Sequence, residues 1–190
     1  MKKLIAIVGM SGSGKSVASD YLEKEGFNKI YFGGVVLDTL KSEGLEINPD
    51  NEKMMRERLR NEHGMAAMAI LLLPKIKESI KNNDTVLDGL YSWDEYLVLK
   101  ETFGDVLKII AIVTDKNTRY ERVGTRKVRP LNKEEITKRD ISEIENLAKG
   151  GPISMADYFI LNNGSIDDYH KRLDQILNEI GGMQNEENDK

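Results

Sequence analysis

The sequence predicts an α/β fold in which a parallel five-stranded sheet carries helices on both faces. Short apolar runs alternate with longer stretches of helical periodicity along the whole chain. The first apolar run leads into a loop rich in glycine and serine, and a helical pattern follows that loop. With 190 residues, 39% of them hydrophobic and 32% charged, the chain suits one globular domain over residues 1–180.

The first half of the chain contains two predicted strands and a helical insertion. Residues 3–8 form a short apolar run that ends at glycine, which is typical of a buried parallel strand. A helix over 15–25 and a strand over 29–32 follow. Residues 33–82 are then predicted to be a helical insertion beside the sheet, with helices over 35–43, 50–62 and 64–82.

The second half repeats the alternation of strands and helices. Strands are predicted over 85–87, 106–113 and 158–161. Ser92 is a candidate N-cap for the helix that follows the first of these strands. The predicted helices cover 92–103, 117–123, 133–149 and 165–180. The polar tail, residues 181–190, is predicted to be disordered.

Composition excludes several classes of protein. No apolar run approaches the ~20 residues that span a membrane, and the N-terminal apolar run is too short for a signal peptide. The chain has no cysteine, which excludes disulfides and thiolate metal sites. A net charge of −4 gives no general attraction to nucleic acid. We therefore expect a cytoplasmic protein without a nucleic-acid or membrane partner, whose phosphate binding comes from local basic clusters.

The stretch "GMSGSGKS", residues 9–16, is a phosphate-binding loop. Its spacing (Gly, four residues, Gly-Lys-Ser) is that of a P-loop, and a strand precedes it and a helix follows it as the motif requires. Backbone N–H groups and the helix dipole hold phosphate oxygens, Lys15 adds a charge and Ser16 ligates Mg²⁺. This motif predicts a P-loop NTPase that uses ATP and Mg²⁺. The predicted nucleotide-binding residues here are Gly9, Met10, Ser11, Gly12, Ser13, Gly14, Lys15, Ser16 and Val17.

Asp88 follows the strand over 85–87, and its carboxylate is predicted to be catalytic. In a parallel sheet this end of the strand faces the phosphate loop. Asp88 is a candidate ligand of Mg²⁺ through water, or the group that takes the proton of the acceptor. The alternative is an aspartate that caps a turn.

A cluster of arginines follows the fourth predicted strand. Arg119, Arg122, Arg126 and Arg129 fall within eleven residues, and Arg139 lies on the next helix. Arginine grips phosphate through two hydrogen bonds and stacks on bases. We predict that Arg122, Arg126 and Arg139 neutralise charge during phosphoryl transfer. The alternative is a solvated basic helix face.

A second basic cluster lies in the insertion and consists of Arg56, Arg58 and Arg60. Arg56 and Arg60 are four residues apart, so that they can share one face of a helix. They are candidates for binding an acceptor phosphate. The alternative is a surface helix in which the arginines pair with neighbouring glutamates.

The order of these features resembles the nucleoside-monophosphate kinase branch of P-loop proteins over about residues 3–180. The stretch "YERVGTRKVR" is similar to the start of an adenylate kinase lid. This similarity implies an arginine-rich lid over 119–139, in which Arg122 stacks on adenine and Arg126 reaches the phosphates. "ADYFILNNGS" is similar to the end of dephospho-coenzyme-A kinases, which implies that the loop from Asn162 to Ser165 lies against the adenine, with Asn163 and Gly164 as the predicted nucleotide-binding residues.

The overall similarity is greatest to a poorly characterised prokaryotic family, described as adenylate-kinase-like or dephospho-coenzyme-A-kinase-like. The acceptor half departs from the better-known enzymes. An Asp and an Arg usual in adenylate kinases align with Gly34 and Leu37, and Asp38 is the nearest carboxylate to the base of dephospho-coenzyme-A kinases. The resemblance leaves as predicted acceptor-binding residues Gly34, Asp38, Arg56, Arg60 and Gly89.

The predicted function is ATP- and Mg²⁺-dependent phosphoryl transfer to a small nucleotide-like acceptor, either a nucleoside monophosphate or dephospho-coenzyme A. The protein is expected to be a monomer or homodimer. The alternative is an ATP-binding regulatory P-loop ATPase without a small-molecule acceptor, which the missing acceptor arginine favours.

Overall fold

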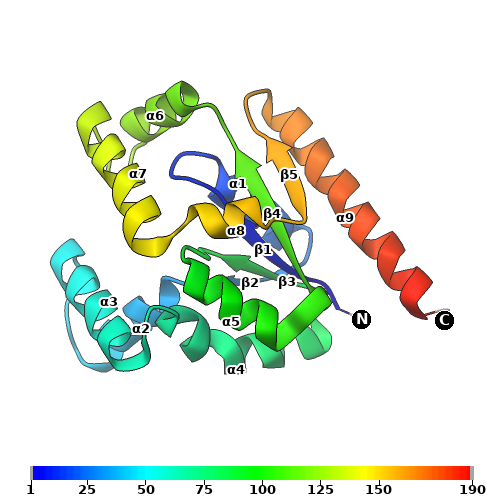
Figure 1. The fold of residues 1–190 in the computed structure, drawn as a ribbon, viewed down its shortest axis with the longest axis horizontal. Coiled ribbons are helices and arrows are strands. Elements are labelled where there is room, and N and C mark those ends of the chain that lie inside the picture. The colour runs from blue at the N-terminus through cyan, green and yellow to red at the C-terminus, as the bar shows by residue number, and fades with distance from the viewer. Residues whose placement is uncertain (1, 189–190) are drawn as a thin grey trace.

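The fold is that of a computed structural model, which describes the backbone of residues 2–188 and the side chains of residues 2–182. Five parallel strands form one sheet in the order β2-β3-β1-β4-β5, and helices pack on both of its faces (Figure 1). This confirms the predicted α/β class. The strands are β1 (Leu4–Val8), β2 (Asn28–Tyr31), β3 (Thr85–Asp88), β4 (Leu107–Val113) and β5 (Tyr158–Leu161).

Helices occupy most of the remaining described chain. They are α1 (Lys15–Lys24), α2 (Gly34–Ser42), α3 (Pro49–His63), α4 (Ala67–Asn82), α5 (Trp93–Phe103), the short 3-10 helix η1 (Gly104–Val106), α6 (Lys116–Thr125), α7 (Lys133–Leu147), α8 (Gly150–Ser154) and α9 (Ile166–Asn188). None of the helices within the described residues is long and apolar enough to cross a membrane.

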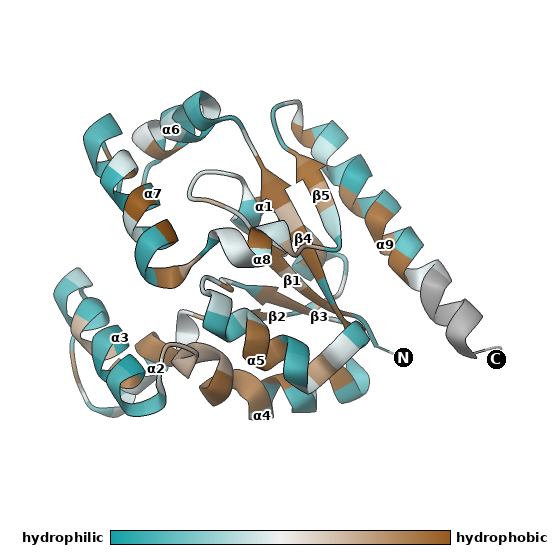
Figure 2. Ribbon diagram, viewed as in Figure 1, coloured by the Kyte–Doolittle hydropathy of each residue, from teal (hydrophilic) through white to brown (hydrophobic). Residues whose placement is uncertain are grey.

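The central strand β1 separates two hydrophobic cores because its side chains alternate between the faces of the sheet. Leu4, Ala6 and Val8 pack with residues of α2, α3, α4 and α5. Ile5 and Ile7 pack with residues of α1 and α9 on the opposite face. The hydropathy colouring shows the apolar strands enclosed by helices, whereas α3 is mostly hydrophilic (Figure 2).

The segment between β2 and β3 folds as α2, α3 and α4, so it is helical as expected. The Asn48 side chain accepts a hydrogen bond from the Asn51 backbone N–H at 2.9 Å, and Pro49 follows as the first helical residue of α3. Gly64, with a φ of 81°, ends α3, so α4 begins at Ala67 rather than at 64. The helix then continues through Pro74.

Two segments differ from the expectations. The chain after α7 forms the short helix α8, which the sequence pattern did not predict. The predicted disordered tail begins at 181, but α9 continues through Asn188. Ile180 is only 1% exposed and packs at the end of the second core, and Gly181 and Gly182 do not end the helix. Residues 189 and 190 lie outside the described residues.

Candidate phosphoryl-transfer site

The phosphate loop joins β1 to α1, and its carbonyl groups point outward to neighbouring elements. The Ser11 carbonyl accepts a hydrogen bond from Arg119 Nη1 at 2.8 Å. The Ser13 carbonyl accepts one from Asn162 Nδ2 at 2.8 Å and one from Thr114 Oγ1 at 3.1 Å. Since these carbonyls are satisfied from outside, the loop can present its N–H groups to an anion, as phosphate-binding nests do.

Close contacts explain two of the glycines in this loop. A Cβ atom at Gly12 would lie 2.6 Å from the Arg119 carbonyl oxygen, and one at Gly14 would lie 2.3 Å from Asn162 Nδ2. Both glycines also have positive φ angles, 80° and 101°, which side chains disfavour. The first turn of α6 and the loop after β5 therefore pack directly against the phosphate loop.

Lys15 lies where the motif predicts, at the start of α1. Its Nζ donates to the Met10 carbonyl at 3.0 Å, so the side chain reaches back across the loop. Burial, followed by the nearby positive charge of Lys149, lowers the pKa of Lys15 to about 7. Asp88 and Glu143 act in the opposite direction. A lysine in this setting gains its full charge when an anion arrives.

Asp88 and Ser16 are brought together by Ser19. The Ser19 hydroxyl contacts Asp88 Oδ2 at 3.0 Å and the Ser16 carbonyl at 3.1 Å. Asp88 is buried at the end of β3, whereas Ser16 is exposed at the start of α1. A hydroxyl and a carboxylate are oxygen ligands that suit Mg²⁺, which keeps several of its waters. These residues therefore fit the predicted metal, Ser16 directly and Asp88 directly or through water.

The arginines of the lid do not share one face. Arg119 is buried and forms a two-bond ion pair with Asp140 of α7, at 2.7 and 3.3 Å, besides its bond to the phosphate loop. It therefore joins three elements instead of facing a ligand. Arg122 instead lies near Tyr169 of α9. Burial raises the pKa of the Tyr169 hydroxyl, and the positive charge of Arg122 opposes that rise. Its Nη1 is buried without a hydrogen-bond partner among the described residues.

The remaining lid arginines make their contacts within the lid and with the insertion. Arg126 donates from Nε and Nη2 to the Arg129 carbonyl, at 2.8 and 2.6 Å. Burial, and next the charge of Arg139, lower the pKa of Arg126. Arg139 in turn lowers the pKa of Lys15, so its charge acts on both Arg126 and Lys15. Arg129 also reaches the insertion, where its Nη2 donates to Glu52 Oε1 at 3.0 Å.

The acceptor side contains Arg60, whose side chain lies near the start of α5. Its Nε is buried without a hydrogen-bond partner in the described part of the chain. Burial lowers the pKa of Arg60, Glu95 opposes this shift, and Arg56 adds to it. Glu95 itself accepts hydrogen bonds from the Tyr91 and Ser92 backbone N–H groups, just beyond Asp88. Arg56 and Arg60 thus face the same end of the sheet as the phosphate loop.

Other predicted acceptor residues are less closely gathered. Gly89 follows Asp88 and packs under Tyr91, whose ring would lie 3.1 Å from a Cβ atom there. Gly34 begins α2 in open space. Asp38 is exposed, and Val36 and Leu40 form the buried face of the same helix. Arg58 turns away from the site and pairs with Glu43 through both carboxylate oxygens.

The loop after β5 contacts the phosphate loop through Asn162, the neighbour of the predicted residues. Asn163 Oδ1 instead accepts a hydrogen bond from the Asp115 backbone N–H at 3.0 Å, which connects this loop to the start of α6. Gly164 lies next to it, near Asp168. The resemblance included Asn162 in the loop against the adenine, but its hydrogen bond to the phosphate loop was not predicted, because an asparagine between two elements carries no sign of which neighbour it will contact.

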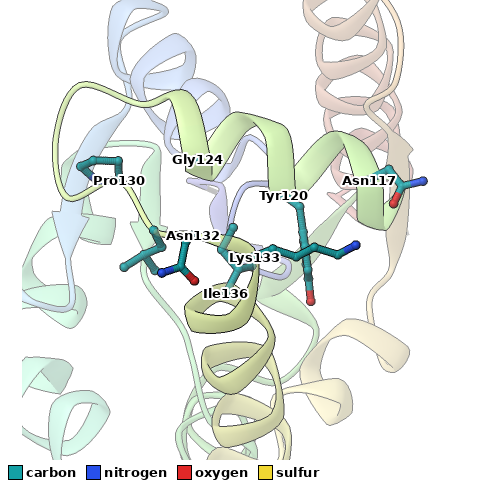
Figure 3. Close-up of a pocket in the computed structure, with 8 residues that line it drawn as sticks. Asn117, Tyr120, Gly124, Pro130, Asn132, Lys133 and Ile136 are labelled. Carbon is teal, nitrogen blue, oxygen red and sulfur yellow. The ribbon is translucent and has the colours of Figure 1, made fainter.

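A cavity of about 560 Å³ lies outside this site, between α6 and the start of α7 (Figure 3). Tyr120, Gly124 and Ile136 line it together with the loop over 130–133. Arg119 and Val123 are the buried residues of α6 and belong to a different face of the helix. The cavity is therefore separate from the phosphate loop.

Two solved structures share this fold. Shikimate kinase from Bacteroides thetaiotaomicron has a TM-score of 0.60 and 12% identity, and the match covers 94% of this chain and 98% of the enzyme. Dephospho-CoA kinase from Campylobacter jejuni has a TM-score of 0.53 and 19% identity, and the match covers 94% of this chain and 97% of the enzyme. The fold is therefore that of P-loop kinases.

Sequence comparison defines the relationship further. Residues 5–145 match the model of the AAA domain, and the chain belongs to this class of P-loop domain. Within it, the protein belongs to the UPF0200 family. UPF0200 protein TK1334 from Thermococcus kodakarensis is 33% identical over 181 residues, and the match covers 93% of this chain and 97% of the relative.

Proposed function

We propose that this protein is an ATP- and Mg²⁺-dependent phosphotransferase whose acceptor is a small molecule that carries a phosphate, of the nucleoside monophosphate or dephospho-coenzyme A type. The observation that carries the proposal is Arg60, a cation with a buried, unpaired Nε on the acceptor side of Asp88. A buried polar group without a partner is costly, so an anionic ligand there compensates it.

The roles of the residues follow from their positions. The phosphate loop and Lys15 hold the β- and γ-phosphates of ATP. Ser16 and Asp88 would hold Mg²⁺, which would supply neutralisation of the charge on those phosphates. The γ-phosphorus bond to the ADP oxygen breaks as a bond to the acceptor oxygen forms. If the acceptor oxygen is a hydroxyl, Asp88 accepts its proton. Arg56 and Arg60 hold the phosphate that the acceptor already carries.

The lid completes this arrangement. Arg139 adds positive charge near Lys15, Arg126 lies near Arg139, and the Arg129–Glu52 ion pair connects the lid to the insertion that holds the acceptor. Closure excludes water, which would otherwise receive the phosphoryl group. In this proposal, Arg122, Asn163 and Gly164 contact the adenine.

A screen of acceptors tests the proposal. ATP consumption and melting temperature are measured with a panel of nucleoside monophosphates, deoxynucleotides and coenzyme A precursors, because a ligand that binds only the folded state raises its melting temperature. We expect one class of acceptor to raise both the ATP consumption and the melting temperature. Turnover that no acceptor changes would instead support the regulatory ATPase.

Two variants connect the result to the site. Lys15→Ala is expected to abolish transfer while the protein stays folded. Arg60→Met is expected to raise KM for the acceptor at least ~10-fold, since charged hydrogen bonds contribute about 1.5–3 kcal/mol. Arg58→Met, which removes an arginine that pairs with Glu43 outside the site, is the matched control. ATP-dependent transfer that persists in Lys15→Ala would contradict the proposal.

A further inference from the structure

A buried lysine lies beside the phosphate loop and belongs to none of the motifs in the sequence. Lys149 is 2% exposed, and its Nζ forms an ion pair with Glu143. The same Nζ lies 4.7 Å from the centre of the Tyr91 ring. Tyr91 follows Asp88 and Gly89 at the end of β3, next to β1, from which the phosphate loop emerges. Lys149 therefore sits between the nucleotide side and the acceptor side.

The backbone holds Lys149 in this place at a cost. Ala148, the residue before it, adopts a left-handed conformation with a φ of 45° at the end of α7. A side chain makes this conformation unfavourable for a residue other than glycine. The Lys149 backbone N–H donates to the Glu143 carbonyl at 3.2 Å, so the main chain folds back toward the residue whose side chain pairs with Nζ.

Glu143 holds two cations at once. Its Oε1 accepts a hydrogen bond from Arg139 Nε at 3.0 Å, and its Oε2 accepts one from Lys149 Nζ. Both cations lie near enough to Lys15 to affect its charge. Lys15, Lys149 and the half-exposed Arg139 thus lie in one group with the carboxylates Glu143 and Asp88, and Asp140 also acts on Lys149.

A purely structural role does not account for this arrangement. A buried ion pair is often no more stabilising than apolar side chains of similar volume, because desolvation offsets the attraction. Placing Lys149 beside Lys15 adds repulsion. An anion that binds between Lys149 and Lys15 offsets both the desolvation of Lys149 and its repulsion by Lys15. The γ-phosphoryl group of a nucleotide bound at the phosphate loop is such an anion.

We propose that Lys149 is a second catalytic cation of this site, which binds the γ-phosphoryl group of ATP opposite Lys15, and that Glu143 is a positioning residue that holds Lys149 and Arg139 in readiness. This inference rests on the proposed function. On binding, Lys149 Nζ exchanges its ion pair with Glu143 for hydrogen bonds to the phosphoryl oxygens. Arg139 stays paired with Glu143 and continues to neutralise it. The charge that develops during transfer then meets a donor on the acceptor side.

Binding of ATP and ADP to Lys149→Met tests the role without an acceptor. Calorimetric titration with each nucleotide and Mg²⁺ measures how much the γ-phosphate adds to affinity. We expect Lys149→Met to lose at least ~10-fold of the preference for ATP over ADP, and Lys149→Arg to keep most of it. Lys138→Met, which removes an exposed lysine of α7 paired with Glu134, is the control and should bind as the wild type does.

The steady-state kinetics of transfer are the second measurement. With the acceptor found in the screen, we expect kcat of Lys149→Met to fall ~10²–10³-fold, as for the loss of one donor to a transition-state oxyanion. The acceptor KM should change little. If Lys149→Met fails to fold, the pair Glu143→Gln with Lys149→Met, which leaves no unpaired carboxylate, takes its place in both measurements.

The outcomes separate the two proposals. A wild-type protein that binds neither nucleotide, or transfers to no acceptor, overturns the proposed function. A wild-type protein that binds and transfers, together with a Lys149→Met variant whose ATP preference and kcat are unchanged, overturns the role of Lys149 alone.

Discussion

Lys15 connects nucleotide binding to pH. Its pKa, lowered to about 7 by burial and by Lys149, means that the free protein loses this charge as pH rises from 6 to 8. Phosphate prefers the charged form, so binding raises the pKa and takes up a proton. Above pH 7, the affinity for ATP should therefore fall by up to ~10-fold for each pH unit.

Calorimetry in buffers of different ionisation enthalpy measures this proton. We expect an uptake at Lys15 of ~0.9 protons for each nucleotide bound at pH 8 and ~0.1 at pH 6. Lys15→Arg, which stays charged throughout, provides the baseline that includes protons released by the nucleotide itself. Equal proton uptake in the two proteins would contradict the lowered pKa.

Asp88 has a partner that allows its role to be separated from stability. Asp88→Asn removes the charge but keeps a side-chain oxygen that can accept the Ser19 hydroxyl. We expect kcat to fall ~10²–10⁴-fold, as for the loss of a positioned general base, while the melting temperature changes little. Ser19→Ala is the control for the lost hydrogen bond. A kcat within twofold of the wild type in Asp88→Asn would restrict Asp88 to a capping role.

The junction of α6, α7 and the phosphate loop depends on one buried ion pair, Arg119–Asp140. Asp140→Ala leaves the guanidinium buried without its charged partner, which typically costs 3–5 kcal/mol. Urea unfolding should show a loss of that size. Glu134→Ala, which breaks the exposed Glu134–Lys138 pair on the same helix, should cost at most about 1 kcal/mol.

Helices and strands were predictable where a period or a cap marks them. The 3.6-residue pattern located α1 and α9, and Ser92 forms the expected cap, since its Oγ accepts from the Glu95 backbone N–H at 3.1 Å. The short helix α8 was missed because five residues do not complete two helical turns. The tail was predicted to be disordered from its local polar composition, which does not show where the helical backbone of α9 ends.

The residues of the candidate site were likewise predictable only where a local motif marks them. Lys15 was predictable because the P-loop motif is local in sequence. The roles of Arg119 and Arg122 were not, because spacing along one helix cannot tell which arginine meets Asp140 and which meets α9. Lys149 resembles any surface lysine in sequence, and only the turn of the chain after α7 buries it.

The two cores meet at β1, so this strand should dominate the stability of the whole molecule. Ile7 is fully buried between α1, α9 and the sheet. Ile7→Ala is expected to lower the free energy of unfolding by about 2–5 kcal/mol. Leu161→Ala, at a position 69% exposed on β5, should change it by less than about 0.5 kcal/mol. Denaturant titration measures both, and equal losses would contradict a central role for β1.

The strand order has a consequence for synthesis on the ribosome. β1 is among the first segments to emerge, yet its partners are β3 and β4, and Leu4 pairs with Thr85 about 80 residues later. At roughly 5–20 residues per second, the strand that carries the phosphate loop waits about 4–16 seconds for a neighbour. During that time an apolar segment is exposed to other chains, which makes the nascent protein a natural client for chaperones that shield such segments until β3 arrives.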